Sequence, residues 1–189
     1  MLSKDRIEKN KEKFQETNLR YNIFTKELEE FLGSDFYHAP ASPSLDLYGC
    51  YPGGLLDHLM KVCKYSLNIN DILPEKIKLN KEKIIKTVFL SQIGKVFLFK
   101  MNDSEWHRTN LGKMYVYNSE GMTALKVGER SAYYATKYGC SLEEDEYQAI
   151  INIDKDSDDK MAKWHSLILS QVMKHGFELA LIEEKYGTR

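Results

Sequence analysis

Two side chains in the first third of the sequence have the types needed for nucleophilic chemistry. Cys50 and His58 could form a thiol–imidazole pair, in which the imidazole takes up the thiol proton and leaves a reactive thiolate. Nothing in their spacing fixes the geometry, so a small buried cysteine is the simpler interpretation of Cys50. Glycine-rich phosphate loops and the His-Glu-x-x-His zinc motif are absent from the sequence.

An acidic run that begins at Asp154 follows part of the calcium-loop pattern, with Asp156 and Asp158 at its third and fifth positions. The sixth position is Asp159 where such a loop needs Gly, and the twelfth is His165 where it needs Glu. We therefore interpret the run as a solvated loop that caps the next helix.

A further stretch interleaves basic and aromatic side chains: Trp106-His107-Arg108, then Lys113, then Tyr115-Val116-Tyr117. Such a surface can stack on unpaired nucleic-acid bases. Aromatic side chains at hairpin spacing are more often core residues, and the sequence leaves both interpretations open.

Six short segments occur in an order that is typical of one protein family. They are Ala39–Ser42, Tyr48–His58, Phe89–Val96, Gly128–Ser131, Leu142–Ile150 and His175–Ala180. This order resembles the HD-domain phosphohydrolase superfamily, in particular small HD proteins of bacteriophages and the HD half of certain bacterial 3′→5′ exoribonucleases. The Gly-Gly-Leu-Leu-x-His and Ile-Gly-Lys motifs are its most specific parts, and the resemblance covers residues 36–186.

The resemblance implies a site in which imidazole and carboxylate side chains bind one or two divalent metals. The metal activates a water molecule and neutralises charge on a phosphate ester. His58 matches the family's early histidine ligand, whereas its central His-Asp pair falls on Ser91 and Gln92. The late aspartate falls on Glu178, and a further histidine falls on Tyr48.

These replacements predict a protein without hydrolytic activity and without a cofactor, because a neutral alcohol and a neutral amide are weak ligands for a transition metal. If a divalent metal such as Mn, Fe, Ni or Zn still binds, His58 and Glu178 are the expected ligands. The pocket itself should persist, with Lys95 kept from the family's Gly-Lys pair. Its expected residues are Tyr48, Asp57, His58, Ser91, Gln92, Lys95 and Glu178.

The leading functional hypothesis is therefore a degenerate HD protein that acts as a binding or interaction module for a nucleotide or a protein partner. One alternative is a metal-dependent phosphohydrolase of nucleotides or RNA with a rearranged ligand set. Another is an oligomeric structural or virion-associated protein that self-associates through residues 4–32. The family look-alikes and the lysine-rich composition favour a phage origin, with the protein in the host cytosol.

The elements that would position these residues are mostly helical. Ile7, Phe14, Tyr21 and Leu28 recur every seven positions, which predicts one helix over residues 4–32. Residues 1–33 would then pack as an amphipathic helix on a single HD-like domain over 34–189. A coiled-coil arm for self-association is the alternative, because residues 4–32 span about four heptads, which is about the minimum length for a coiled coil.

The rest of the chain predicts an all-α bundle with one small hairpin insertion. A helix should begin near Gly54 and end before Pro74, and Ser141 with Glu144 has the spacing of a capping box. A short strand is expected at residues 114–117. Further helices are expected at residues 80–99, 122–138, 142–153 and 158–186.

Composition places the chain among ordinary globular proteins. It has 189 residues, 42% of them hydrophobic, and a net charge of −1 from 27 basic and 28 acidic side chains. No apolar run is long enough to span a bilayer, so no membrane association is expected. Three widely spaced cysteines favour a reducing compartment, and the balanced charge excludes a strongly basic nucleic-acid-binding surface at the level of the whole chain.

Overall fold

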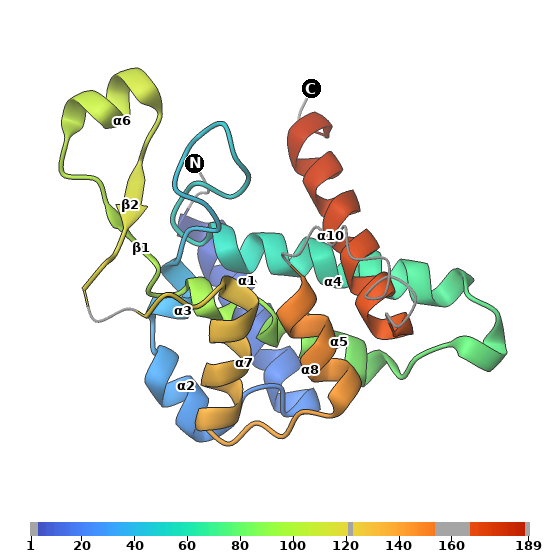
Figure 1. The fold of residues 1–189 in the computed structure, drawn as a ribbon. Coiled ribbons are helices and arrows are strands. Elements are labelled where there is room, and N and C mark those ends of the chain that lie inside the picture. Colours follow the sequence, from blue (N-terminus) through green and yellow to red (C-terminus); the bar gives the residue numbers. More distant parts are fainter. Residues whose placement is uncertain (1–3, 121–122, 154–166, 188–189) are drawn as a thin grey trace.

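The computed structural model describes residues 4–120, 123–153 and 167–187. The fold is all-α with one two-stranded sheet among these residues, which confirms the predicted fold class (Figure 1). The acidic run at 154–159 and the first part of the helix predicted at 158–186 lie outside the described residues. The α-helices are α1 (Lys4–Tyr21), α2 (Lys26–Leu32), α3 (Asp35–His38), α4 (Gly54–Ile72), α5 (Lys81–Leu90), α6 (Glu105–Leu111), α7 (Val127–Lys137), α8 (Glu144–Asn152) and α10 (Ile168–Tyr186).

The prediction of one uninterrupted helix over residues 4–32 was wrong, because the chain turns between α1 and α2. The Asn18 side chain accepts a hydrogen bond from the Phe24 backbone N–H at 2.7 Å, and Asn22 takes a left-handed φ of 47°. The Thr25 hydroxyl then accepts from the Leu28 N–H and caps α2. The Asn18 and Thr25 side chains thus replace helical hydrogen bonds, and the left-handed backbone of Asn22 lets the chain turn between them.

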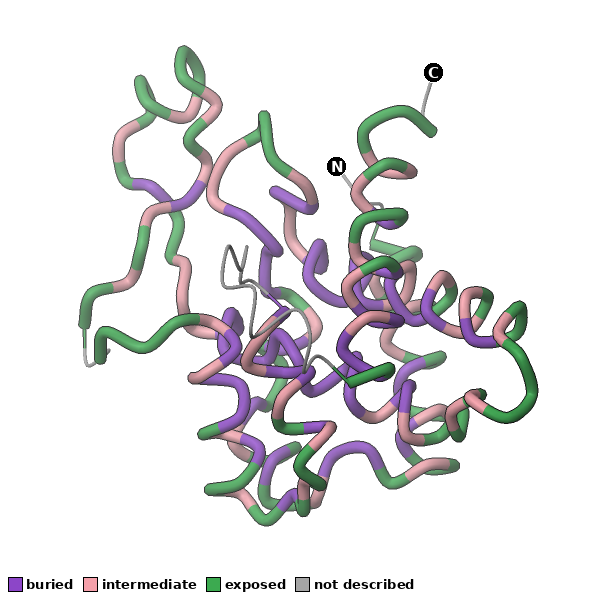
Figure 2. Tube along the Cα trace, turned by 45° about the vertical axis from the view of Figure 1, so that its right-hand side comes forward, coloured by how far each residue is buried: buried purple, intermediate pink, exposed green. Residues whose placement is uncertain are grey.

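Phe14 of α1 and Leu28 and Leu32 of α2 point into the core of the domain, whereas Leu19 is 89% exposed. Phe14 is fully buried and packs its ring against Phe24, Phe36 and Phe89 at centroid distances of 4.9–5.0 Å. Buried residues fill the centre of the molecule, whereas the tips of the chain's projections are exposed (Figure 2). Self-association through residues 4–32 stays a prediction, but their buried aromatic rings already stabilise the domain itself.

Helix α4 begins where the sequence predicts and runs to Ile72, and α10 packs against it. The two backbones approach closely at Gly176, where an added Cβ would lie 2.2 Å from the Ser66 hydroxyl oxygen.

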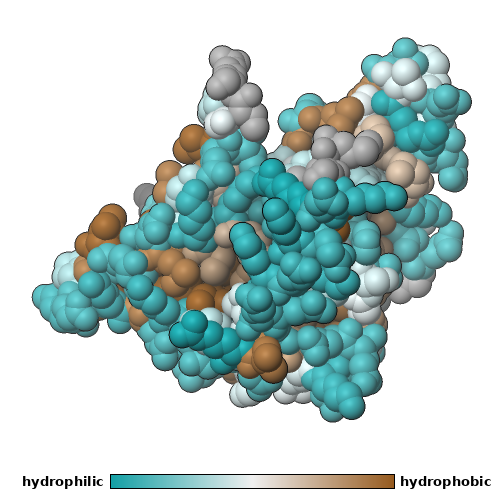
Figure 3. Space-filling view, turned by 180° about the vertical axis from the view of Figure 1, so that it is seen from behind, coloured by the Kyte–Doolittle hydropathy of each residue, from teal (hydrophilic) through white to brown (hydrophobic). Residues whose placement is uncertain are grey.

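No helix among the described residues is long and apolar enough to cross a membrane. Seen from behind, the surface is mostly hydrophilic with separate hydrophobic patches (Figure 3).

The helix predicted over residues 80–99 is shorter than expected. Helix α5 ends at Leu90, a 3₁₀ turn covers Ile93–Lys95, and strand β1 (Phe99–Met101) follows. The chain leaves the helix because Gly94 packs directly on α7: its N–H donates to the Ser131 hydroxyl at 2.9 Å, and an added Cβ would lie 2.7 Å from the Val127 carbonyl oxygen.

The predicted hairpin insertion is confirmed, with strand β2 (Tyr115–Tyr117) antiparallel to β1 and helix α6 between them. Phe99 pairs with Tyr117 and Met101 pairs with Tyr115. The insertion, residues 99–117, projects from the helical body with α6 at its tip (Figure 1).

The start of α8 differs from prediction: Glu143 rather than Ser141 is the N-cap, and its N–H donates to Glu146 at 2.8 Å.

Candidate functional site

A glycine turn places residues 45–52, which we name the aromatic loop, over the start of α4. Gly53 has a left-handed φ of 79°, which costs little without a Cβ. An added Cβ on Gly54 would lie 2.0 Å from the Gly49 carbonyl oxygen, so the loop can cross the helix start only at a glycine. Tyr48 and Tyr51 are thereby held beside the first turns of α4.

His58 lies in the interior, with none of its surface exposed. Its Nδ1 is 3.2 Å from a carboxylate oxygen of Glu184, and its ring packs against Tyr48 and Phe177 at centroid distances of 4.4 and 4.9 Å. Its Nε2 has no hydrogen-bond partner among the described residues. Burial lowers the pKa of His58 below its ordinary 6.5, although Glu184 acts in the opposite direction. The ring is therefore held mainly neutral.

We expect this buried ring to make stability depend on pH. Because the pKa of His58 is lower in the folded state, its contribution is complete above 6.5 and is lost as the pH falls towards the folded-state pKa. Urea unfolding measured across this range should show a decrease in stability that His58→Gln removes. The exposed His107→Gln variant should keep it; equal pH slopes for the wild type and His58→Gln would contradict the assignment.

Asp57 is a buried carboxylate that four side chains contact. It accepts hydrogen bonds from Arg6 at 2.9 Å, Asn10 at 3.1 Å and Tyr51 at 2.9 Å, and it lies 3.0 Å from the Lys61 ammonium. Burial alone would raise the pKa of Asp57, but these partners, led by Lys61, hold it below its ordinary value. Asp57 thus joins α1, the aromatic loop and α4.

Glu184 is the acidic partner of His58, and sequence reasoning missed it. Its side chain is 9% exposed and lies 2.8 Å from the Lys61 ammonium. Burial opposes its charge, but hydrogen bonds from His58 and Lys61 keep its pKa below the ordinary value. The sequence contains an indication of this role, because Glu184 lies seven residues after Phe177. Residues seven apart lie on the same face of a helix.

The predicted acidic partner, Glu178, does not take that place in the structure. Its side chain is 51% exposed and pairs with His175 at 3.1 Å on the outer surface of α10. Glu178 directly follows Phe177, and one step along a helix rotates a side chain by about 100°, here away from the face that packs on His58. The expected pairing of His58 with Glu178 is therefore replaced by His58 with Glu184.

The remaining predicted residues lie between α5 and the aromatic loop. The buried Lys95 ammonium donates to the Tyr48 hydroxyl at 2.6 Å, which links it to the ring beside His58. The Ser91 hydroxyl donates to the Val88 carbonyl at 2.7 Å within its own helix end. Gln92 is fully buried, and neither of its amide atoms has a hydrogen-bond partner among the described residues. The structure thus joins Tyr48 to His58 through a ring contact and to Lys95 through a hydrogen bond.

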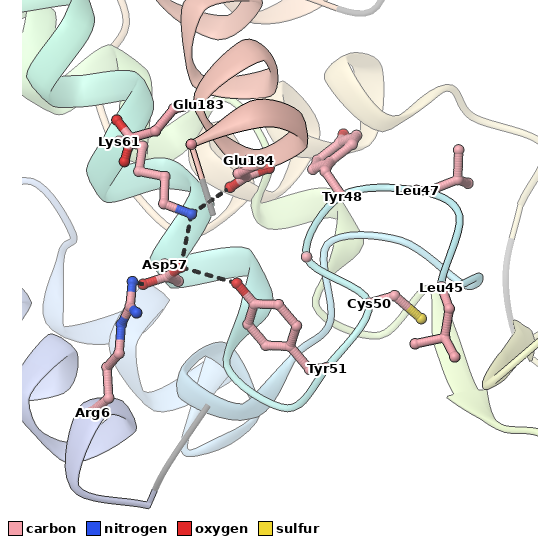
Figure 4. A pocket seen from close by; sticks show the side chains of 12 residues that line it. Arg6, Leu45, Leu47, Tyr48, Cys50, Tyr51, Asp57, Lys61, Glu183 and Glu184 are labelled. Atoms are coloured by element: carbon pink, nitrogen blue, oxygen red, sulfur yellow. Dashed lines mark hydrogen bonds and ion pairs between the residues drawn. The ribbon is translucent and has the colours of Figure 1, made fainter. Parts of the chain in front are cut away.

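A cleft of about 430 Å³ opens beside this network (Figure 4). Arg6, Asp57, Lys61 and Glu184 form its ionic wall, and the loop with Leu45, Leu47, Tyr48 and Cys50 forms the other wall. Burial, with Asp46 nearby, raises the pKa of the Cys50 thiol to about 11. The raised pKa disfavours the thiolate, which is the nucleophilic form of cysteine. His58 Nδ1 contacts Glu184, so the geometry does not favour the thiol–imidazole pair either.

The aromatic and basic side chains of the insertion are divided between surface and interior. Trp106 and Tyr117 are exposed, whereas Tyr115 is buried and the Arg108 guanidinium donates to the Asn102 carbonyl.

No group of three or more His, Cys, Asp or Glu side chains suited to a metal ion occurs in the described part of the chain. Comparisons with protein-family models, curated proteins and solved structures found no match, so the HD resemblance rests on the sequence motifs alone.

Proposed function

We propose that this chain is a non-catalytic binding module that recognises a protein partner. The position of Lys61 is the observation from which we infer the absence of catalysis. Its ammonium lies 3.0 Å from Asp57 and 2.8 Å from Glu184, between the two buried carboxylates of the cleft (Figure 4). A side chain of the protein itself therefore supplies the positive charge that these acids need.

This arrangement supports a structural role for the ionic network. Both carboxylates are desolvated, and a buried charge is stable only when it is paired and hydrogen-bonded. Arg6 and Lys61 pair with these charges, the neutral His58 ring hydrogen-bonds to Glu184, and the contacts fix α1, α4 and α10 to one another. The alternative of a working metal phosphohydrolase requires a cation to displace Lys61 or to use other ligands.

The nucleotide alternative for this cleft is less well supported than a protein partner. Its lining includes two basic side chains, Arg6 and Lys61, against three acidic ones, Asp57, Glu183 and Glu184. A phosphate would meet net negative charge, since Lys61 is already paired twice.

The loop and the insertion instead expose a set of large hydrophobic side chains, which we name the apolar rim. Its members are Leu45, Leu47, Met101, Trp106, Leu111 and Tyr117, each at least 46% exposed. The two segments are joined, because the Leu45 N–H donates to the Gly112 carbonyl at 2.9 Å and the Tyr115 N–H donates to the Pro43 carbonyl at 3.0 Å. Exposed aromatic and Met side chains of this kind are typical of protein interfaces.

Photo-crosslinking tests the proposal in the cells that naturally make the protein. p-Benzoylphenylalanine is placed at Trp106, at Leu47 or, as a matched exposed control on α4, at Ile72, which is 83% exposed. We expect the first two positions to yield the same protein adduct and Ile72 to yield none. The surface Tyr117→Ser substitution should weaken both adducts.

Two results would contradict the proposed function. Equal adducts from all three positions would show that the rim is not a specific surface. A stoichiometric divalent metal, lost in His58→Ala and accompanied by chelator-sensitive phosphoester turnover, would establish the phosphohydrolase alternative instead.

A further inference from the structure

A second pocket lies between α2 and α7 and shares no lining residue with the cleft. It encloses about 290 Å³, and its wall contains Phe31, Arg130, Tyr133, Tyr134, Lys137 and Tyr138. Among the residues that the structure describes, no acidic side chain belongs to its lining. Aromatic rings and two cations without a neighbouring carboxylate in the wall make a site suited to an anion.

Arg130 provides the first indication of a missing partner. The residue is 4% exposed, and its Nη2 donates to the Thr123 carbonyl at 2.7 Å. Its Nη1 is buried and has no hydrogen-bond acceptor among the described residues. A buried guanidinium N–H without an acceptor is costly, and such groups commonly indicate an ion or water that completes the site.

Lys137 and the rings provide the second indication. The Lys137 ammonium lies 5.5 Å from the centroid of the Tyr133 ring and 5.3 Å from that of Tyr138. Phe31 stacks on Tyr138 at 4.1 Å and meets Tyr134 edge-on at 5.0 Å, which fixes the rings as one aromatic wall. Tyr133 is 49% exposed and leaves part of its ring available for stacking.

We propose that this pocket binds a small anion that carries an aromatic ring, the class that includes aryl phosphates and mononucleotides. The anionic group is held by Arg130 and Lys137, and the ring stacks against the tyrosine wall. The volume is near the lower limit for small-molecule sites, which fits one such molecule rather than a polymer. The proposal is independent of the function assigned to the cleft.

Titration calorimetry at low salt, with adenosine 5′-monophosphate as the probe, tests the site on the full chain. Adenosine supplies the ring without the charge, and inorganic phosphate supplies the charge without the ring. We expect saturable binding of the monophosphate and about tenfold weaker binding of each partial probe. Amide NMR shifts should concentrate at residues 130–138 and not at the cleft residues 45–61.

Lys137→Gln should weaken the monophosphate by about fivefold or more, since it removes one charged contact. The matched control is Arg20→Gln, because Arg20 also lies over a tyrosine ring, at 5.1 Å from the centroid of Tyr21, but lines no described pocket. Arg130→Lys should weaken binding further. If this variant does not fold, Lys137→Gln and the two partial probes still test the proposal. Absent binding at millimolar probe, equal loss in both Gln variants, or shifts confined to residues 45–61 would overturn the proposal.

Discussion

Lys61→Met should destabilise the protein by about 3 kcal/mol near neutral pH, because it leaves two buried carboxylates without their shared cation. Asp57 and Glu184 expose only 5% and 9% of their side chains, so water from the cleft replaces the lost ammonium only in part. Arg6 and His58 remain as partial partners, which places the expected cost at the lower end for a broken buried ion pair. Urea unfolding measures the change.

The matched control lies one turn further along α4. Lys64 pairs with Glu183, but its side chain is 58% exposed, so Lys64→Met should change stability by about 0.5 kcal/mol or less. The cost of Lys61→Met should also shrink in acid, because protonation of the two carboxylates removes the unpaired charge. A penalty that is unchanged by acid would assign the effect to lost packing of the lysine stem.

The local features that the sequence predicted were those governed by residues close in the chain. Gly53 and Gly54 fixed the start of α4, and the alternating aromatic residues around Val116 marked β2. The break after Tyr21 was missed because the hydrophobic heptad continues through it. The turn depends on the Asn18 and Thr25 side chains, whose capping roles are weaker signals than hydrophobic periodicity.

The candidate site was predicted only in part, because tertiary packing brings its residues together. Tyr48, His58 and Lys95 were placed together through the family resemblance, and the structure joins them through one hydrogen bond and one ring contact. The choice of Glu178 over Glu184 depended on the rotation of α10, which tertiary packing sets. Residues distant in sequence, such as Arg6 and Lys61, meet at Asp57 only in the folded chain.

Gly54→Ala should destabilise the protein by about 3 kcal/mol, even though alanine favours a helix by about 1 kcal/mol over glycine. The added Cβ would lie 2.0 Å from the Gly49 carbonyl oxygen and 2.7 Å from its carbonyl carbon. Both are backbone atoms, so relief requires the whole loop to move. That oxygen also accepts the Ala41 N–H at 2.9 Å, and the loop carries Tyr48 to His58 and Lys95.

Gly33→Ala separates this steric effect from the general cost of replacing a glycine. Gly33 has a φ of 53° and a ψ of −145°, a conformation that favours glycine, and an added Cβ would find its nearest atom at 4.0 Å, so backbone strain alone should cost about 2 kcal/mol. Near-UV circular dichroism should report the displaced tyrosines in Gly54→Ala and remain close to wild type in Gly33→Ala. If the near-UV spectrum of Gly54→Ala also stays close to wild type, the close crossing of the loop over α4 is wrong, and the placement of Tyr48 beside His58 is wrong with it.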